Sequence, residues 1–183
     1  LGDVYKRQVQ ELVNKGLILA GHDISAGGLI TTLLEMCFAN VEGGMEINLD
    51  KIKEQALIKI LFAENPGIVI QVSDKHKETV KQILEDAGVG YVKLGKPTDE
   101  RHILVSKGDA TYQFGIDYMR DVWYSTSYLL DRKQSMNGCA KKRFENYKMQ
   151  PVEFAFMPDF KGKFSQYGID PDRRTPSGLR AAI

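Results

Sequence analysis

The sequence predicts an α/β (α+β) fold in which a mixed sheet packs against helices. Short runs of β-branched or alternating apolar residues predict strands, and the longer stretches between them have the period of helices. Glycine, proline and asparagine separate these segments, as they do at turns. The 183 residues are 43% hydrophobic and 27% charged, which is typical of a globular domain with a buried core.

The first half of the chain is predicted to alternate between helices and strands. The segment 28–40 is apolar nearly all round and Glu35 is its one charged residue, so we expect a helix buried on several sides. The segment 68–72 is β-branched and apolar enough to predict a central strand. The other helices are predicted over 5–15, 51–55 and 56–62, and the other strands over 17–20 and 45–49.

The second half continues this alternation as far as Gln134. A helix over 74–87 ends at Gly88, and a helix over 117–133 carries an apolar stripe that we expect to be buried. The stripe consists of Met119, Val122, Trp123, Thr126, Leu129 and Leu130. Strands are predicted over 91–94, 102–105 and 111–114, with turns at 95–97 and 107–109.

Beyond Gln134 the helical and strand periods both fail, and basic residues, aromatics and prolines are scattered. A nucleic-acid-binding segment is one interpretation, but RNP, KH and zinc-finger patterns are missing. We therefore expect one domain over residues 1–134 and an extended linker over residues 135–183, draped on a neighbouring domain. The chain lacks an initiator Met and ends in apolar residues 181–183, so we expect a fragment of a larger protein.

Charge and cysteine content limit the class of protein. The formal net charge of +1 gives no general attraction to nucleic acid or to an anionic membrane. Cys37 and Cys139 lie far apart and in no metal-binding spacing, and Cys37 is expected to be a buried thiol. No apolar run reaches the roughly 18 residues of a membrane span. A reduced, cytoplasmic location is therefore expected.

The candidate functional site is the glycine-rich stretch from Gly21 to Leu29, between a predicted strand and a predicted helix. Backbone N–H groups of such a turn, together with a helix N-terminus, attract anions, and Gly27 and Gly28 would let a phosphate approach closely. Asp23 and Ser25 alternate, which suggests a carboxylate for Mg2+ and a hydroxyl for a phosphate oxygen. A plain structural connection between strand and helix is the alternative.

Other common signatures are missing from the sequence. There is no Walker A motif, no dinucleotide-binding glycine fingerprint, no zinc-binding spacing and no G-x-S-x-G elbow. His76 and His102 are expected to be surface or strand residues, whereas His22 lies beside Asp23 in the candidate site.

The stretch 21–29 resembles the HD-x-S-x-GGL signature of the C-terminal domain in the PurM/PurL superfamily, whose members are related to aminoimidazole ribonucleotide (AIR) synthetase. Three further stretches resemble the large, single-chain phosphoribosylformylglycinamidine synthases (PurL type). These are 33–39 (LLEMCFA), 61–64 (LFAE) with 67–72, and 122–128. The final residues 180–183 resemble the start of the strand that opens the glutaminase domain of those enzymes.

The resemblance implies a PurM-like C-terminal domain, the second of two in the synthase, followed by a linker to a truncated glutamine amidotransferase domain. The implied activity is the conversion of formylglycinamide ribonucleotide to formylglycinamidine ribonucleotide in de novo purine biosynthesis, with ATP and glutamine consumed. It implies Asp23 as a Mg2+ ligand and Ser25 as a contact to ATP or ADP, with Gly27 and Gly28 beside the phosphates. The implied partners are the PurM-like N-terminal domains and the glutaminase domain of the same polypeptide.

The resemblance assigns no catalytic residue to this chain, because the glutaminase nucleophile would lie beyond Ile183. Residues 1–183 alone are therefore expected to be inactive. A non-catalytic half-domain that holds a structural nucleotide, or acts as a scaffold, is the main alternative. Another enzyme of the superfamily, such as selenophosphate synthetase, is a weaker alternative, because its reactive Cys near a glycine-rich N-terminal segment has no match here.

Overall fold

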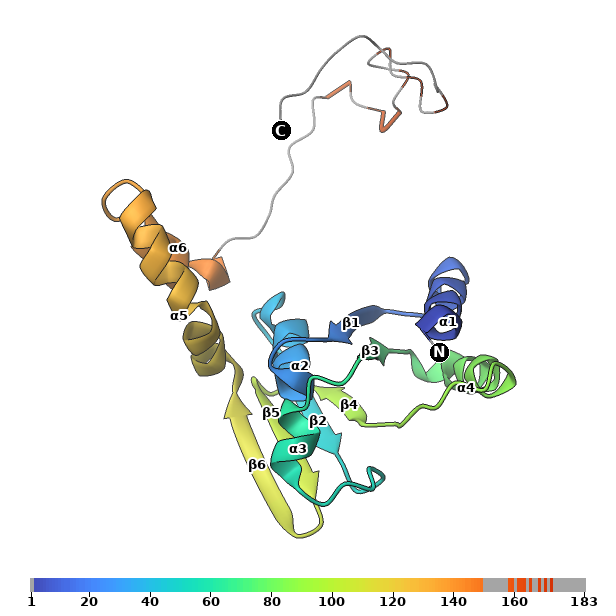
Figure 1. Cartoon of the computed structure of the whole chain (residues 1–183). Helices are drawn as coiled ribbons and strands as arrows, with labels where there is room; N and C mark the ends of the chain where they lie inside the picture. The colour runs from blue at the N-terminus through green and yellow to red at the C-terminus, as the bar shows by residue number, and fades with distance from the viewer. Residues whose placement is uncertain are drawn as a thin grey trace. The chain divides into compact units, whose positions relative to one another are not determined.

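The computed structural model describes residues 2–149 and, beyond them, residues 158, 159, 161–163, 165, 168, 170 and 172. The chain divides into two units, Leu1–Tyr147 and Lys148–Ile183. The first unit contains a four-stranded sheet, a two-stranded sheet and six helices among its described residues (Figure 1). The prediction of an α/β domain with a mixed sheet is therefore confirmed.

The four-stranded sheet has the order β4-β2-β5-β6. Its strands are β2 (Gly44–Asn48), β4 (Gly95–Thr98), β5 (His102–Lys107) and β6 (Ala110–Gly115). β2 and β5 are parallel, and the pairs β2–β4 and β5–β6 are antiparallel. The register places Ile47 beside Val105, and both side chains are buried under the helices.

Helices α2 (Gly28–Phe38) and α3 (Leu57–Phe62) supply the other half of this core. As predicted, α2 is buried on several sides: Leu29, Ile30, Leu33, Leu34 and Cys37 are all buried. Burial also raises the pKa of the Cys37 thiol, and the nearby Arg101 guanidinium opposes that shift. α2 is thus the central helix of the unit.

The two-stranded sheet pairs β1 (Ala20–Ile24) with β3 (Gly67–Gln71), antiparallel. A second, smaller core lies at one end of it, where Leu12 of α1 (Gly2–Asn14) packs with Leu17 and Val80. Val80 belongs to α4 (Lys77–Asp86), which follows a short 3-10 helix, η1 (Asp74–His76). Figure 1 shows α1 and α4 together beyond the ends of β1 and β3.

Several predicted strands are shifted in the structure. The strand predicted over 17–20 is wrong, because β1 runs from Ala20 to Ile24 and includes His22 and Asp23. The segment 91–94 is not a strand, and the predicted turn at 95–97 is β4, in which Pro97 lies opposite Met45. β4 is an edge strand of the sheet, where a proline that cannot donate to the ladder is tolerated.

The strand predicted over 68–72 is present as β3, but the expectation that it is central in its sheet is wrong. In the described part of the chain β3 pairs with β1 alone, and the Ile68 side chain is 44% exposed. The helix predicted over 51–55 is a turn stabilised locally, since the Asp50 backbone N–H donates to the Asn48 side chain.

The long helix α5 (Ile116–Gln134) has the predicted extent, but of its predicted apolar stripe Met119 packs against the larger core and most of the rest is exposed. Val122, Trp123, Leu129 and Leu130 are each at least half exposed, whereas Arg120 is buried. Arg120 is buried because α6 (Cys139–Glu145) packs against α5: its guanidinium donates to the Phe144 carbonyl at 2.8 Å.

Residues 135–147 are therefore not an extended linker. The Arg120 guanidinium also lies 3.8 Å from the centre of the Tyr147 ring, a cation–π contact that joins α5 to the start of η2 (Tyr147–Met149). The stretch 180–183, which resembles the start of a glutaminase domain, lies outside the described residues.

Candidate functional site

The candidate site lies where β1 ends and α2 begins. Asp23 is a strand residue, Ser25 follows the strand, and Gly27 precedes the first residue of α2. The Asp23 side chain is 71% exposed and Ser25 is exposed. The structure thus brings Asp23 and Ser25 to the same end of an open strand, where an external ligand can reach both.

Gly27 and Gly28 are each required by the local backbone conformation and by packing. Gly28 has φ +72°, and a Cβ there would lie 2.7 Å from the Leu61 carbonyl oxygen, so it permits the close approach of α3 to α2. Gly27 has φ +82°, and a Cβ there would collide with the Thr31 side chain. Backbone conformation and packing therefore require these glycines, whether or not a phosphate lies beside them.

The backbone N–H groups of both glycines already have acceptors. Gly27 donates to the Glu64 carboxylate at 2.9 Å, and Gly28 donates to the Ser25 carbonyl at 3.0 Å. A carboxylate at this position also interacts favourably with the positive end of the α2 dipole. The N–H of Gly27, just before α2, is thus paired with Glu64, the last residue of the LFAE stretch that begins in α3.

His22 links Asp23 to the helices. Its Nδ1 lies 2.8 Å from the Asp23 carbonyl oxygen and 3.5 Å from the Asp23 carboxylate, and its Nε2 lies 3.2 Å from the Glu35 carboxylate. The other Glu35 oxygen accepts a hydrogen bond from the Trp123 indole at 2.8 Å. Buried Thr32 donates a further hydrogen bond to the Asp23 carbonyl, at 3.0 Å. The Asp23 carbonyl is therefore contacted by two side chains, Thr32 from α2 and His22 from β1 itself.

The arrangement fits Mg2+ only as part of a shared site. In the described ranges no group of three or more His, Cys, Asp or Glu side chains is placed to hold a metal ion. Mg2+, however, is commonly bound by one or two carboxylates together with water and substrate phosphates. Asp23, exposed at the end of β1, suits the role of one such carboxylate.

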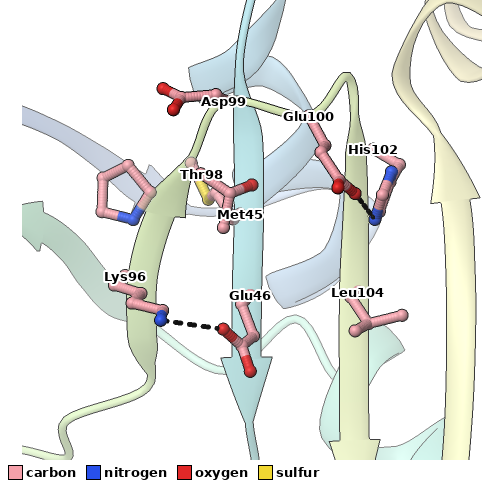
Figure 2. Close-up of a pocket in the computed structure, with 9 residues that line it drawn as sticks. Met45, Glu46, Lys96, Thr98, Asp99, Glu100, His102 and Leu104 are labelled. Carbon is pink, nitrogen blue, oxygen red and sulfur yellow. Dashed lines mark ion pairs between the residues drawn. The ribbon is translucent and has the colours of Figure 1, made fainter.

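Two hollows lie in the described part of the chain, and the second borders Ile24, the residue after Asp23. One, of about 540 Å³, lies on the polar outer face of the four-stranded sheet, where Lys96 pairs with Glu46 and Glu100 with His102 (Figure 2). The other, of about 670 Å³, is largely apolar and borders α3, with Ile58 and Phe62 exposed at it. Neither is lined by Asp23 or Ser25.

Comparisons with known proteins connect this geometry to a family. Residues 4–107 match the family described as "AIR synthase related protein, C-terminal domain". The chain belongs to this family. The match covers β1, the turn and α2, and it extends to the last residue of β5.

Known proteins similar to this chain include phosphoribosylformylglycinamidine synthases. The chain is 35% identical over 144 residues to a probable phosphoribosylformylglycinamidine synthase, chloroplastic/mitochondrial, of Arabidopsis thaliana, and 33% identical over 134 residues to the human phosphoribosylformylglycinamidine synthase. These alignments cover 78% and 71% of this chain but 10% of each relative. The predicted resemblance is confirmed, and the chain spans about a tenth of the length of these relatives.

Solved structures confirm the fold. T. maritima PurL complexed with ATP superposes with a TM-score of 0.56 at 16% sequence identity, over 62% of this chain and 20% of that chain.

In the described residues no helix is both long and apolar enough to cross a membrane.

Sequence reasoning missed four residues that shape the site: Thr32, Glu35, Glu64 and Trp123. One signal was present, because Glu35 is the single charge in an otherwise apolar helix and such a charge calls for a partner. The partners themselves lie 13 and 88 residues away along the chain, at His22 and Trp123.

Proposed function

We propose that this chain is part of a phosphoribosylformylglycinamidine synthase, an ATP-dependent C–N ligase with glutamine as the amido donor. Its substrate would be formylglycinamide ribonucleotide, and its place would be in cytoplasmic purine biosynthesis. The observation that carries the proposal is 33–35% identity to such synthases across more than two thirds of the chain. The remaining domains, including the glutaminase, would lie on the same polypeptide.

Within that enzyme the chain would supply one wall of a nucleotide site. Asp23 would hold Mg2+ bound to ATP or ADP, and the Ser25 hydroxyl would donate to a phosphate oxygen. When bound, Mg2+ neutralises negative charge on the phosphate oxygens. Gly27 and Gly28 would lie beside the phosphates and, by their conformations, fix where Ser25 and the start of α2 lie.

The experiment compares Asp23→Asn and Ser25→Ala with Asp109→Asn in the complete polypeptide that carries this sequence. Asp109 lies in the exposed turn between β5 and β6 and serves as a matched control. Calorimetric titration with ADP and Mg2+ should show affinity lowered about tenfold or more by the first two changes and unchanged by the control. Wild-type affinity in both site variants would refute the assignment.

A second candidate is a half-domain that holds a nucleotide without consuming it. The observation that favours it is that the Gly27 N–H already donates to the Glu64 carboxylate, so this N–H is not free to bind a transferred phosphate. ADP that stays bound through purification and through turnover would support this candidate, whereas exchange of labelled ADP at the rate of turnover would support the catalytic one. In either case residues 1–183 alone should produce no formylglycinamidine ribonucleotide.

A further inference from the structure

A chain of polar contacts runs from helix α5 to the proposed metal ligand. It starts at the Trp123 indole N–H, which donates to Glu35 at 2.8 Å, and continues from Glu35 to His22 Nε2 at 3.2 Å. His22 Nδ1 then lies 2.8 Å from the Asp23 carbonyl oxygen. Three elements, α5, α2 and β1, thus contribute one side chain each to a line that ends at Asp23.

The members of this line differ in how far the protein encloses them. Trp123 packs on Phe38 of α2, with ring centroids 5.3 Å apart, so its indole is fixed relative to α2. The Glu35 and His22 side chains are 23% and 32% exposed, whereas Asp23 is 71% exposed. Asp23 is the exposed end of a line whose other members are partly enclosed by protein.

The line also fixes the orientation of the His22 ring. Both ring nitrogens face oxygen atoms, one on Glu35 and one on Asp23, and these oxygens lie on different elements. Both oxygens can only accept, so the two contacts are hydrogen bonds together when Nδ1 and Nε2 each carry a proton, and such a ring cannot rotate without losing one of them. It therefore restricts both the Asp23 carbonyl, which Thr32 also holds, and the Asp23 carboxylate 3.5 Å away.

We infer that His22, Glu35 and Trp123 are positioning residues that hold the Asp23 carboxylate in the orientation required for Mg2+. The inference rests on the proposed function, since it assigns the three residues to the same Mg-nucleotide site. Partners that orient a ligand from behind typically change metal affinity about 10- to 100-fold when removed. The line also ties the site to α5, so the Trp123 indole should respond to changes at His22.

The first measurement uses the 183-residue chain, which has a single Trp. Its one indole ¹⁵N–H resonance should move upfield in Glu35→Ala, where the acceptor is lost. It should stay near its wild-type position in Glu35→Gln, which keeps an acceptor oxygen. It should also move in His22→Ala, because Glu35 loses its other partner. An indole resonance that is unchanged in Glu35→Ala and His22→Ala overturns the inference.

The second measurement uses the complete polypeptide and separates positioning from general stability. ADP affinity is measured with and without Mg2+, and the ratio is the Mg2+ enhancement. His22→Ala and Glu35→Ala should lower this ratio about tenfold while ADP affinity without Mg2+ is retained, and Glu35→Gln should restore most of it. Glu42→Ala, at an exposed position after α2, is the matched control and should leave the ratio unchanged.

A third variant guards against misfolding of the alanine variants. Trp123→Phe keeps an aromatic ring against Phe38 and removes only the N–H donor, so it should lower the Mg2+ enhancement by a smaller factor, about threefold. Wild-type enhancement in Trp123→Phe and Glu35→Ala, with Asp23→Asn still defective, overturns the inference and leaves the proposed function standing. No enhancement in the wild-type polypeptide overturns both.

Discussion

The two sheets of this domain are built from strands of similar length, but they are covered very differently. In the four-stranded sheet, Ile103 and Val105 of β5 are fully buried beneath α2 and α3. In the two-stranded sheet, β1 is exposed or half-buried along its whole length, and Ile68 of β3 is 44% exposed. The candidate site lies on the less covered of the two.

The difference indicates that the two sheets have different roles, one in the packing of the core and the other in presenting the candidate site. The four-stranded sheet packs with α2 and α3 around the larger of the two cores, and burial of apolar surface is the main favourable contribution to the free energy of folding. The two-stranded sheet leaves Asp23 exposed. It packs only partly buried side chains, among them Ile24 and Val69, against the larger core, and polar contacts with α2 add to this packing. Helix α2 contacts both sheets. One side of it packs in the larger core, and Thr32 and Glu35 make polar contacts with β1.

The largest expected effect is in the covered sheet. Ile103→Ala should lower the free energy of unfolding by about 4 kcal/mol, because it leaves a cavity at a fully buried position. Ile68→Ala is the matched change in the two-stranded sheet and should lower the free energy of unfolding by no more than about 1 kcal/mol. Urea unfolding of both variants gives the comparison, and equal losses would contradict the division between the sheets.

The next largest effect is expected at Gly28, where α2 meets α3. Gly28→Ala combines a left-handed φ with a Cβ placed 2.7 Å from backbone atoms of Leu61 and Phe62, so it should cost about 3 kcal/mol. Gly108→Ala is the matched control, since its φ is +54° but nothing lies within 4 Å of the added Cβ, and it should cost about 1 kcal/mol. Similar losses by thermal unfolding would show that conformation alone, without packing, explains Gly28.

The sequence predicted the fold class and most helices, because hydrophobic period and helix-ending glycines are local signals. α2 and α5 were predicted to within two residues of their observed ends. Pairing is not a local signal, so the position of β3 beside β1 and of β4 at a sheet edge could not be read from their residues.

The candidate site was predicted in part for the same reason. Asp23 and Ser25 are two residues apart, so their nearness follows from the sequence, but Asp23 was expected in a turn and lies in β1 instead. Glu64 and Trp123 reach the site from 37 residues beyond Gly27 and 88 residues beyond Glu35. Contacts over such separations depend on tertiary packing, which a single sequence does not reveal.

A smaller effect is expected from the hydrogen bond between Tyr147 and Asp117. Tyr147 donates to Asp117 at 2.8 Å, and burial together with this carboxylate raises the pKa of Tyr147 to about 12. A raised pKa in the folded state favours the protonated form, so this contribution is fully present below pH 10 and is lost as pH rises towards 12.

Wild-type stability should therefore fall more steeply than that of Tyr147→Phe between about pH 10 and 12, by about 1 kcal/mol after allowing for solvent screening. Urea unfolding at a series of pH values measures the difference. Parallel pH profiles for the two proteins would show that the Asp117–Tyr147 contact does not distinguish the folded from the unfolded state.

The smallest expected effect on stability is at Asp23, on the two-stranded sheet. Its side chain is 71% exposed, so Asp23→Asn should change the free energy of unfolding by no more than about 0.5 kcal/mol. Thr32→Val is the matched change behind it: it removes a buried hydroxyl that donates to the Asp23 carbonyl, and should cost about 1–2 kcal/mol. If Asp23→Asn were the more destabilising of the two, Asp23 would be a structural residue of β1 and the open sheet would not be specialised for a ligand.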